Sequence, residues 1–381
     1  MTGALAGLRV LERSSGAAAA YAGRLFAVCG ADVTLVEPPG GTQLRREPPF
    51  VPNAAEPSAL FTYLAAGKSS SVCDLATAAG RAGFDAMLAT TDVLFDDTPV
   101  GERAALGLDP QRIARDFPAV VFVSILPFGA FGPRADWRAT ELGSLHSGGE
   151  GYLTPNGLAI ERHPDRPPVK IYGQFANFQG GTAAATAAIA ALIARPREKG
   201  QFVDVSVQDA NVTESAIALQ RWADGVLETR ATRSFRYGGV LECQDGEIEV
   251  LTLEQHQWEA LVQLSGESGW ADSGDFDDSL ERSRRGAEIN RHLRAWAKRN
   301  RVDEVVRRGR ELGVPIVRYA SPGEVLGDVR ARARGLFANV TLADETAFPV
   351  LLAPFQFSAT PAALRSAPPK LDERRREPAH V

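Results

Sequence analysis

The segment Leu5–Gly41, LAGLRVLERSSGAAAAYAGRLFAVCGADVTLVEPPGG, holds the pattern that decides the fold. It opens with an apolar run over 5–13 and continues with an alanine-rich, helix-forming run over 17–30 that ends in glycine. A second apolar run over 31–41 closes with proline and glycine. The order is strand, helix, strand. Because such a unit needs a right-handed crossover, it favours a parallel sheet.

Further apolar runs extend this pattern along the N-terminal half. Residues 90–97 (TTDVLFDD) and 119–125 (AVVFVSI) are predicted strands. Residues 182–194 form an alanine-rich helix suited to close packing, and a charged loop leads from it to a strand over 201–207. The sequence therefore predicts an α/β fold with a doubly wound, Rossmann-like parallel sheet.

The pattern changes after Thr213. Residues 238–253 are typical of a hairpin that turns at Asp245-Gly246, and 254–266 of a helix packed on it. The arginine-rich stretch over 289–313 is predicted to be one amphipathic helical segment with a solvated face. These features predict a large α/β domain over 1–215 plus 320–381 and a smaller α+β domain over 216–319. Residues 365–381, proline-rich and then charged, are predicted to be a surface tail.

Composition restricts the class of protein. The chain has 381 residues, 44% of them hydrophobic and 23% charged, as in an ordinary globular protein. A net charge of −5 gives no basis for binding nucleic acid or an anionic membrane. The three cysteines are far apart, so we expect buried thiols in a reducing compartment rather than a disulfide framework or a metal site. The N-terminus shows no signal-peptide pattern, and we expect a cytoplasmic protein.

Six blocks of sequence resemble a known family. They are GLRVLERSSGAAAAYAGRLFAVCGADVTLVEPPGG, GKSSSVCDL, SILPFGAFGP, KGQFVDVSVQDA, DGEIEVLTLEQHQWEAL and GVPIVRYASPGEVLGDVRARARGLF. Read in this order, they resemble the class III CoA-transferase (CaiB/BaiF) family, which includes formyl-CoA and carnitine CoA-transferases and α-methylacyl-CoA racemases. The resemblance implies that two chains thread through each other as an interlocked dimer. It also implies acyl-CoA and carboxylic acid substrates, with coenzyme A entering as a thioester and no tightly bound cofactor.

The resemblance also places the reactive residue. Transferases of this family use an aspartate just before the alanine-rich helix as a nucleophile that forms a mixed anhydride and then an aspartyl-CoA thioester. That position is Asn177 here, and no aspartate or glutamate lies between Asp165 and Arg195. The racemase branch pairs a histidine with the same aspartate, and its histidine position falls at about Thr140.

Two residues nearby are candidates for the site. Glu141 matches an acidic position that formyl-CoA transferases place beside the thioester, although a carboxylate there could equally satisfy backbone N–H groups at a helix start. His146 follows in a glycine-rich loop, where a lone histidine is more often structural than catalytic.

The expected CoA-binding positions depart from the family pattern. The CoA-binding candidates are Ala18, Arg45, Arg46, Lys68 and Asp97. Asp97 stands where an asparagine is usual, Pro99 where many relatives have arginine, and Ser69 replaces an arginine. A pyrophosphate needs N–H donors and fixed positive charge, so these changes predict weakened CoA binding. Only Gly238-Gly239 corresponds to the family's glycine-rich lid.

Three hypotheses follow. The chain could be the non-nucleophilic subunit of a CoA-transferase, pairing as a heterodimer with a homologous chain that carries the aspartate. It could instead be a homodimeric acyl-CoA isomerase, lyase or transferase that uses Glu141 or Asn177 as a polar anchor in a non-covalent mechanism. It could also be a non-catalytic scaffold on the same fold. The sequence does not identify the acyl group.

Overall fold

The structure, a computed structural model, describes residues 3–373 apart from a set of short ranges and single positions: 51–57, 155–164, 166–168, 195–198, 215–224, 226–236, 267, 272–273, 275, 343–344 and 346. The chain divides into two compact units. The first comprises Met1–Gly151, Lys170–Gln220 and Arg330–Val381, and the second Tyr152–Val169 and Arg221–Val329. That residues 216–319 fold as a separate domain stays a prediction.

The first unit is built on a six-stranded sheet in which all paired strands run parallel. Its order is β3 (Ser69–Val72), β2 (Asp32–Glu37), β1 (Arg9–Arg13), β4 (Val93–Asp96), β5 (Val121–Leu126) and β6 (Phe202–Ser206). The chain order reverses between β1 and β4, as expected of a doubly wound sheet. The predicted fold class is confirmed, and the strand-helix-strand unit of Leu5–Gly41 forms its centre.

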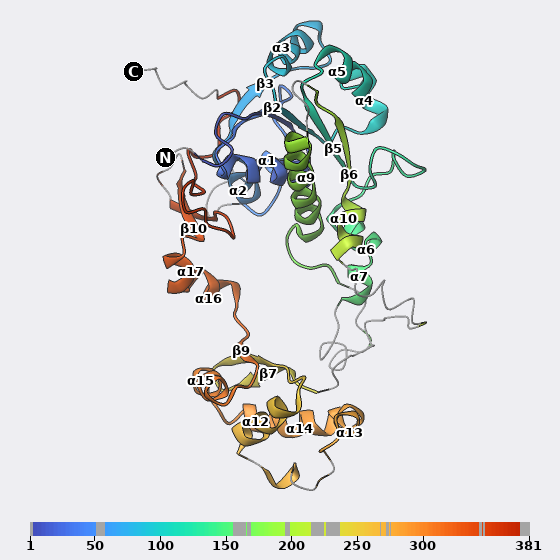
Figure 1. The fold of residues 1–381 in the computed structure, drawn as a ribbon. Coiled ribbons are helices and arrows are strands. Elements are labelled where there is room, and N and C mark those ends of the chain that lie inside the picture. Colours follow the sequence, from blue (N-terminus) through green and yellow to red (C-terminus); the bar gives the residue numbers. More distant parts are fainter. Residues whose placement is uncertain are drawn as a thin grey trace. The chain divides into compact units, whose positions relative to one another are not determined.

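Helices cover both faces of this sheet (Figure 1). Helices α1 (Ala17–Val28) and α9 (Phe175–Ala194) lie side by side on one face. Val93 and Phe95 belong to the same buried apolar cluster as residues of these two helices. The other face carries α3 (Ala78–Leu88) and α5 (Pro110–Asp116), which pack on Leu94. Successive side chains of β4 point to opposite faces of the sheet, and helices cover both faces. The strand is therefore apolar on both sides, and its sequence is a continuous hydrophobic run.

Helices α1 and α9 approach closely because small residues form their contact. A Cβ atom placed on Gly181 would lie 2.5 Å from the carbonyl oxygen of Ala18. Ala184 and Ala188 are fully buried in the same contact. On another side of α9, a Cβ atom on Gly180 would lie 2.8 Å from the side chain of Val207, which begins α10 (Val207–Glu214). The close packing expected of the alanine-rich helix is therefore present, and it fixes the start of α9 against α1.

Shorter elements complete the first unit. They are 3-10 helix η1 (Gln43–Arg46), α2 (Ala59–Ala65), α4 (Val100–Leu106), α6 (Glu141–Ser147), α10 (Val207–Glu214), and the antiparallel pair β10 (Phe337–Thr341) and β11 (Ala347–Leu351). Helix α7 (Glu150–Leu153) follows α6, and α17 (Val329–Ala333) precedes β10.

The described part of the C-terminal tail is held to the sheet edge. The N–H of Ser70 donates to the carbonyl of Glu373, and the N–H of Val72 donates to the carboxylate of Asp372. Residues 365–373 thus lie largely on the surface, as predicted, and are hydrogen-bonded to β3. Residues 374–381 lie outside the described part of the chain.

The second unit has its own core. An antiparallel sheet of β7 (Gly239–Cys243), β8 (Gly246–Val250) and β9 (Ile316–Arg318) packs against α12 (Gln255–Ser265), α14 (Gly286–Ala297) and α15 (Val302–Leu312). The remaining elements are η3 (Ser268–Trp270), α13 (Ser279–Arg284) and α16 (Pro322–Gly327). The hairpin at Asp245-Gly246 is confirmed.

One element of this unit differs from the prediction. The stretch 289–313 is two helices, α14 and α15, rather than one. The Asn300 side chain donates to the carbonyl of Trp296, and the carboxylate of Asp245 accepts from the N–H of Val302. These bonds end one helix and begin the next. Among the described residues, no helix in either unit is long and apolar enough to cross a membrane.

Candidate functional site

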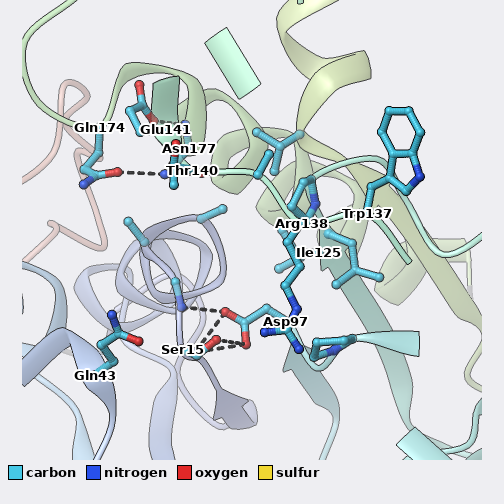
Figure 2. Close-up of a pocket in the computed structure, with 18 of the residues that line it drawn as sticks. Ser15, Gln43, Asp97, Ile125, Trp137, Arg138, Thr140, Glu141, Gln174 and Asn177 are labelled. Atoms are coloured by element: carbon cyan, nitrogen blue, oxygen red, sulfur yellow. Dashed lines mark hydrogen bonds between the residues drawn. The ribbon is translucent and has the colours of Figure 1, made fainter. Parts of the chain in front are cut away.

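A cavity of about 490 Å³ lies within the first unit, at the carboxyl ends of its strands (Figure 2). Ser15 and Gly16 follow β1, Asp97 follows β4, and Val207 follows β6, and all four line the cavity. Because the strand order reverses between β1 and β4, the two loops after these strands separate and leave a crevice. Open α/β sheets bind their ligands at this place. The loop 135–140 and the first turn of α9 complete the lining.

Glu141, the first residue of α6, joins the beginnings of two helices. One carboxylate oxygen accepts the N–H of Ala176 at 2.8 Å, and the other accepts the N–H of Asn177 at 3.0 Å. The residue is 8% exposed and still lines the cavity. The first N–H groups of a helix have no partner within it, so Glu141 satisfies two of those of α9 and places negative charge at its positive end.

Asn177 lies in this first turn of α9 and is half-buried. Its amide nitrogen donates to the side-chain oxygen of Gln174 at 2.7 Å, and both residues line the cavity. Figure 2 shows Glu141, Asn177, Gln174 and Thr140 gathered together. The structure thus brings Asn177 close to Thr140 and Glu141, although Asn177 lies 36 residues after Glu141 in the sequence.

Asp97 marks another part of the cavity. Its carboxylate accepts the N–H of Ser15 at 2.9 Å and the N–H of Gly16 at 2.7 Å, and the Ser15 hydroxyl donates to it at 3.1 Å. These donors stand at the start of α1, so Asp97 caps that helix. Burial, followed by the charge of the neighbouring Asp96, raises the pKa of Asp97 to about 7.

The cations expected to hold phosphate do not line the cavity. Lys68 is buried and forms an ion pair with Glu12 at 2.5 Å. Burial lowers the pKa of Lys68. Arg45 pairs with the buried Glu37 at 2.6 Å, and Arg46 donates to a backbone carbonyl on the surface. Lys68, Arg45 and Arg46 thus lie outside the cavity lining, and their assignment to CoA phosphate stays a prediction.

The other predicted residues divide in the same way. Ala18 and Pro99 line the cavity, whereas Ser69 is buried in β3 beside Thr34, and His146 on α6 is absent from the lining. Gly238 precedes β7 of the second unit, and Gly239 is its first residue.

Sequence reasoning missed several cavity residues. Gln174, Glu47, Asp136, Trp137 and Arg138 line the cavity. For Asp136, Trp137 and Arg138 the signal in the sequence is only that 127–140 connects the end of a strand to a helix, at the ligand-binding edge of a parallel sheet. Glu47 and Gln174 carry no such signal. In the part of the chain that the structure describes, no group of three or more His, Cys, Asp or Glu side chains could hold a metal ion.

Comparison with known proteins agrees with this architecture. The family model described as CoA-transferase family III matches residues 5–375. The chain belongs to CoA-transferase family III. A CAIB/BAIF family protein from Brucella suis, solved by crystallography, has 28% identity and a TM-score of 0.87, covering 98% of this chain and 97% of its own.

Two characterised relatives belong to the same family. The succinate–glutarate CoA-transferase of Agrobacterium fabrum is 28% identical, covering 97% of this chain and 93% of the relative. Subunit BbsE of the succinyl-CoA:(R)-benzylsuccinate CoA-transferase of Thauera aromatica is 26% identical, covering 94% of this chain and 89% of the relative. This family III protein therefore shares its length and fold with enzymes that act on CoA thioesters.

Proposed function

We propose that this family III protein is the subunit of a CoA-transferase that lacks the nucleophilic carboxylate and works with a homologous catalytic chain. The observation that carries the proposal is Asn177, an amide at the start of α9 within the cavity. By resemblance, a family transferase has its aspartate at this point. Such a carboxylate would lie at the N-terminal end of a 20-residue helix, where partial positive charge stabilises an anion.

The chemistry explains why an amide cannot replace that carboxylate. Transfer through the enzyme requires an anionic oxygen that attacks the thioester carbonyl, forms an anhydride and expels the CoA thiolate. The amide of Asn177 carries no charge, and its nitrogen donates to Gln174. Glu141 is the nearest candidate replacement, but both of its oxygens accept backbone N–H groups of α9. These bonds support an anchoring role for Glu141.

A named relative supports a heteromeric arrangement. The Thauera aromatica protein is described as one subunit of its transferase, and this chain aligns with it over 94% of its length. We propose a heterodimer with a homologous chain; the interlocked form of the dimer and a cytoplasmic location stay predictions. Coenzyme A enters as a thioester substrate, and a carboxylic acid accepts it.

Co-expression tests the proposal. This chain is expressed alone and together with a homologous chain that has aspartate at the position of Asn177, and succinyl-CoA consumption is measured with a panel of carboxylic acids. We expect a stable complex and turnover only from the pair. Equal turnover by this chain alone would contradict the proposal.

A second candidate is an acyl-CoA isomerase, lyase or transferase with a non-covalent mechanism. Asp97 specifically favours it, because a carboxyl group in a cavity with a pKa of about 7 is suited to accept and return a proton near neutral pH. This candidate predicts turnover by the isolated chain without a hydroxylamine-labile adduct, and loss of that turnover in Asp97→Asn.

A further inference from the structure

The peptide that joins Ala176 to Asn177 is held on both sides by side chains from other helices. Its carbonyl, that of Ala176, accepts from the Nδ2 amide of Asn211 on α10 at 3.1 Å. Its N–H, that of Asn177, donates to the carboxylate of Glu141 on α6 at 3.0 Å. The other oxygen of Glu141 accepts the N–H of Ala176 at 2.8 Å. The backbone that carries the Asn177 side chain is therefore fixed from two directions.

Asn211 is a buried amide whose orientation is settled by its acceptors. The residue is 1% exposed, and its Nδ2 also donates to the carbonyl of Val207 at 2.7 Å. Both acceptors are backbone carbonyls, so the reversed amide would place oxygen against oxygen. Both hydrogens of Nδ2 are thus used, whereas Oδ1 is buried and has no hydrogen-bond partner among the described residues.

The backbone does not need the Asn211 amide. Ala176 lies in the first turn of α9 and Val207 in that of α10, and within a helix each carbonyl pairs with the N–H four residues later. Leucine has nearly the shape of asparagine and would leave both carbonyls paired, while removing the unpartnered Oδ1. A buried acceptor without a partner destabilises a fold, so stability does not explain this amide. What the amide adds is a fixed place for the peptide before Asn177.

Helix α10 is itself firmly placed, so Asn211 can act as a reference point. The Gln208 side chain donates at 2.9 Å to the carbonyl of Ser147, the last residue of α6. A Cβ atom on Gly148 would lie 2.5 Å from the Cβ atom of Asn211, which leaves room only for glycine. The end of α6 therefore packs directly on α10, and the start of α6 carries Glu141. Helices α6, α9 and α10 thus support one another around the start of α9.

The fixed peptide sets where the Asn177 amide stands in the cavity. Its Nδ2 donates one hydrogen to the side-chain oxygen of Gln174 at 2.7 Å, and both residues line the cavity (Figure 2). An amide nitrogen carries a second hydrogen, which Asn177 can offer to a ligand. A donor already held in place binds a carbonyl oxygen better than a mobile one, because its freedom is lost before the ligand arrives.

We propose that Asn211 is a positioning residue that fixes the Asn177 amide as a hydrogen-bond donor to the thioester carbonyl of an acyl-CoA. The proposal rests on the proposed function, in which residue 177 faces the thioester and forms no covalent bond to it. Asn211 is not among the residues that line the cavity, so it acts through the peptide between Ala176 and Asn177.

Two probes that differ by one acetyl group test the proposal: acetyl-CoA and free CoA. Their dissociation constants are measured by titration calorimetry on the full chain and on Asn211→Leu. We expect the variant to bind acetyl-CoA about fivefold more weakly and free CoA nearly unchanged. The control Thr213→Val removes a bond of the same kind, from a side chain of α10 to the carbonyl of Asp209 four residues earlier, on the exposed side of the helix. It should change neither affinity.

A double-mutant cycle separates positioning from a general loss of structure. Asn177→Ala should weaken acetyl-CoA binding about tenfold, and adding Asn211→Leu should weaken it no further. Asn211→Leu should melt no lower than the unaltered chain, because it removes a buried oxygen that lacks a partner. Asn211→Ala removes the same amide without filling its place and should give the same pattern with the two probes, so the test does not depend on one variant.

Three results would overturn the proposal. The first is equal weakening of acetyl-CoA and CoA binding by both Asn211 variants, which is the mark of a merely structural role. The second is a double variant in which the two losses of affinity multiply. The third is no binding of either probe up to about 1 mM. No turnover enters these measurements, so an acyl adduct on Asn177 would refute the proposed function while the cycle still reports whether Asn211 positions that residue.

Discussion

Replacing Glu141 by alanine should loosen the start of α9. The change removes a carboxylate that accepts the N–H groups of Ala176 and Asn177 at 2.8 and 3.0 Å. A hydrogen bond to a charged group contributes about 1.5–3 kcal/mol, and loss of a helix cap costs about 0.5–2 kcal/mol. Because the two bonds share one carboxylate and water can enter from the cavity, we expect a loss of about 2–4 kcal/mol. Glu141→Gln keeps one acceptor and should lose about 1–2 kcal/mol.

Hydrogen exchange measured on the peptide over residues 172–182 reports this change locally. Each 1.4 kcal/mol is a factor of ten, so Glu141→Ala should speed exchange at Ala176 and Asn177 roughly thirty- to a thousandfold. Glu102→Gln is the matched control, since its carboxylate forms an exposed ion pair with Arg138 and should contribute less than about 1 kcal/mol. Unchanged exchange in Glu141→Ala, or an equal effect of Glu102→Gln, would refute the anchoring role.

Three further predictions concern the scaffold around the cavity. Lys68→Met should lower the free energy of unfolding by about 3–5 kcal/mol in denaturant titrations, because it leaves the Glu12 carboxylate buried without its partner, and adding Glu12→Gln should recover much of the loss. Gly181→Ala should destabilise the folded protein by about 1–3 kcal/mol, because its Cβ would lie 2.5 Å from the Ala18 carbonyl oxygen. Gly83 lies on the exposed face of α3, where a Cβ would meet no atom within 4 Å, so Gly83→Ala should stabilise it by about 0.5–1 kcal/mol. Burial alone would raise the pKa of Glu37, but hydrogen bonds from Arg45, Ser70 and Thr42 outweigh it and hold that pKa below the ordinary 4.5. The stability that Glu37 contributes is therefore present above about pH 4.5 and is lost as the pH falls. The difference in unfolding free energy between the unaltered chain and Glu37→Gln should shrink on acidification.

The sequence predicted the elements whose causes are local. The strand-helix-strand unit over 5–41 and the Asp-Gly hairpin follow from apolar periodicity and turn residues within a few positions of each other. The break between α14 and α15 was not predicted, because Asp245 lies 57 residues from the N–H of Val302 that it accepts. The helical periodicity of the sequence over 289–313 continues across the end of α14 and the start of α15, where the distant Asp245 carboxylate caps the second helix.

The site divides along the same line. The role of Asn177 came from family resemblance, since no local pattern links it to Glu141, 36 residues away. Lys68 was considered for phosphate because the resembling family has a lysine at this point, whereas its ion-pair partner Glu12 is 56 residues away and gives no signal in the sequence. Burial of a charge depends on such distant partners, and a single sequence does not show them.

The most direct test of the central claim is the covalent state of Asn177 after exposure to an acyl-CoA. The purified chain, alone and in complex with a homologous chain that carries the aspartate, is mixed with succinyl-CoA, analysed as intact protein by mass spectrometry, and then treated with hydroxylamine. We predict no added mass on residues 172–182 of this chain, and a hydroxylamine-labile adduct on the partner chain alone. A hydroxylamine-labile mass increase that maps to residues 172–182 of this chain would contradict the claim.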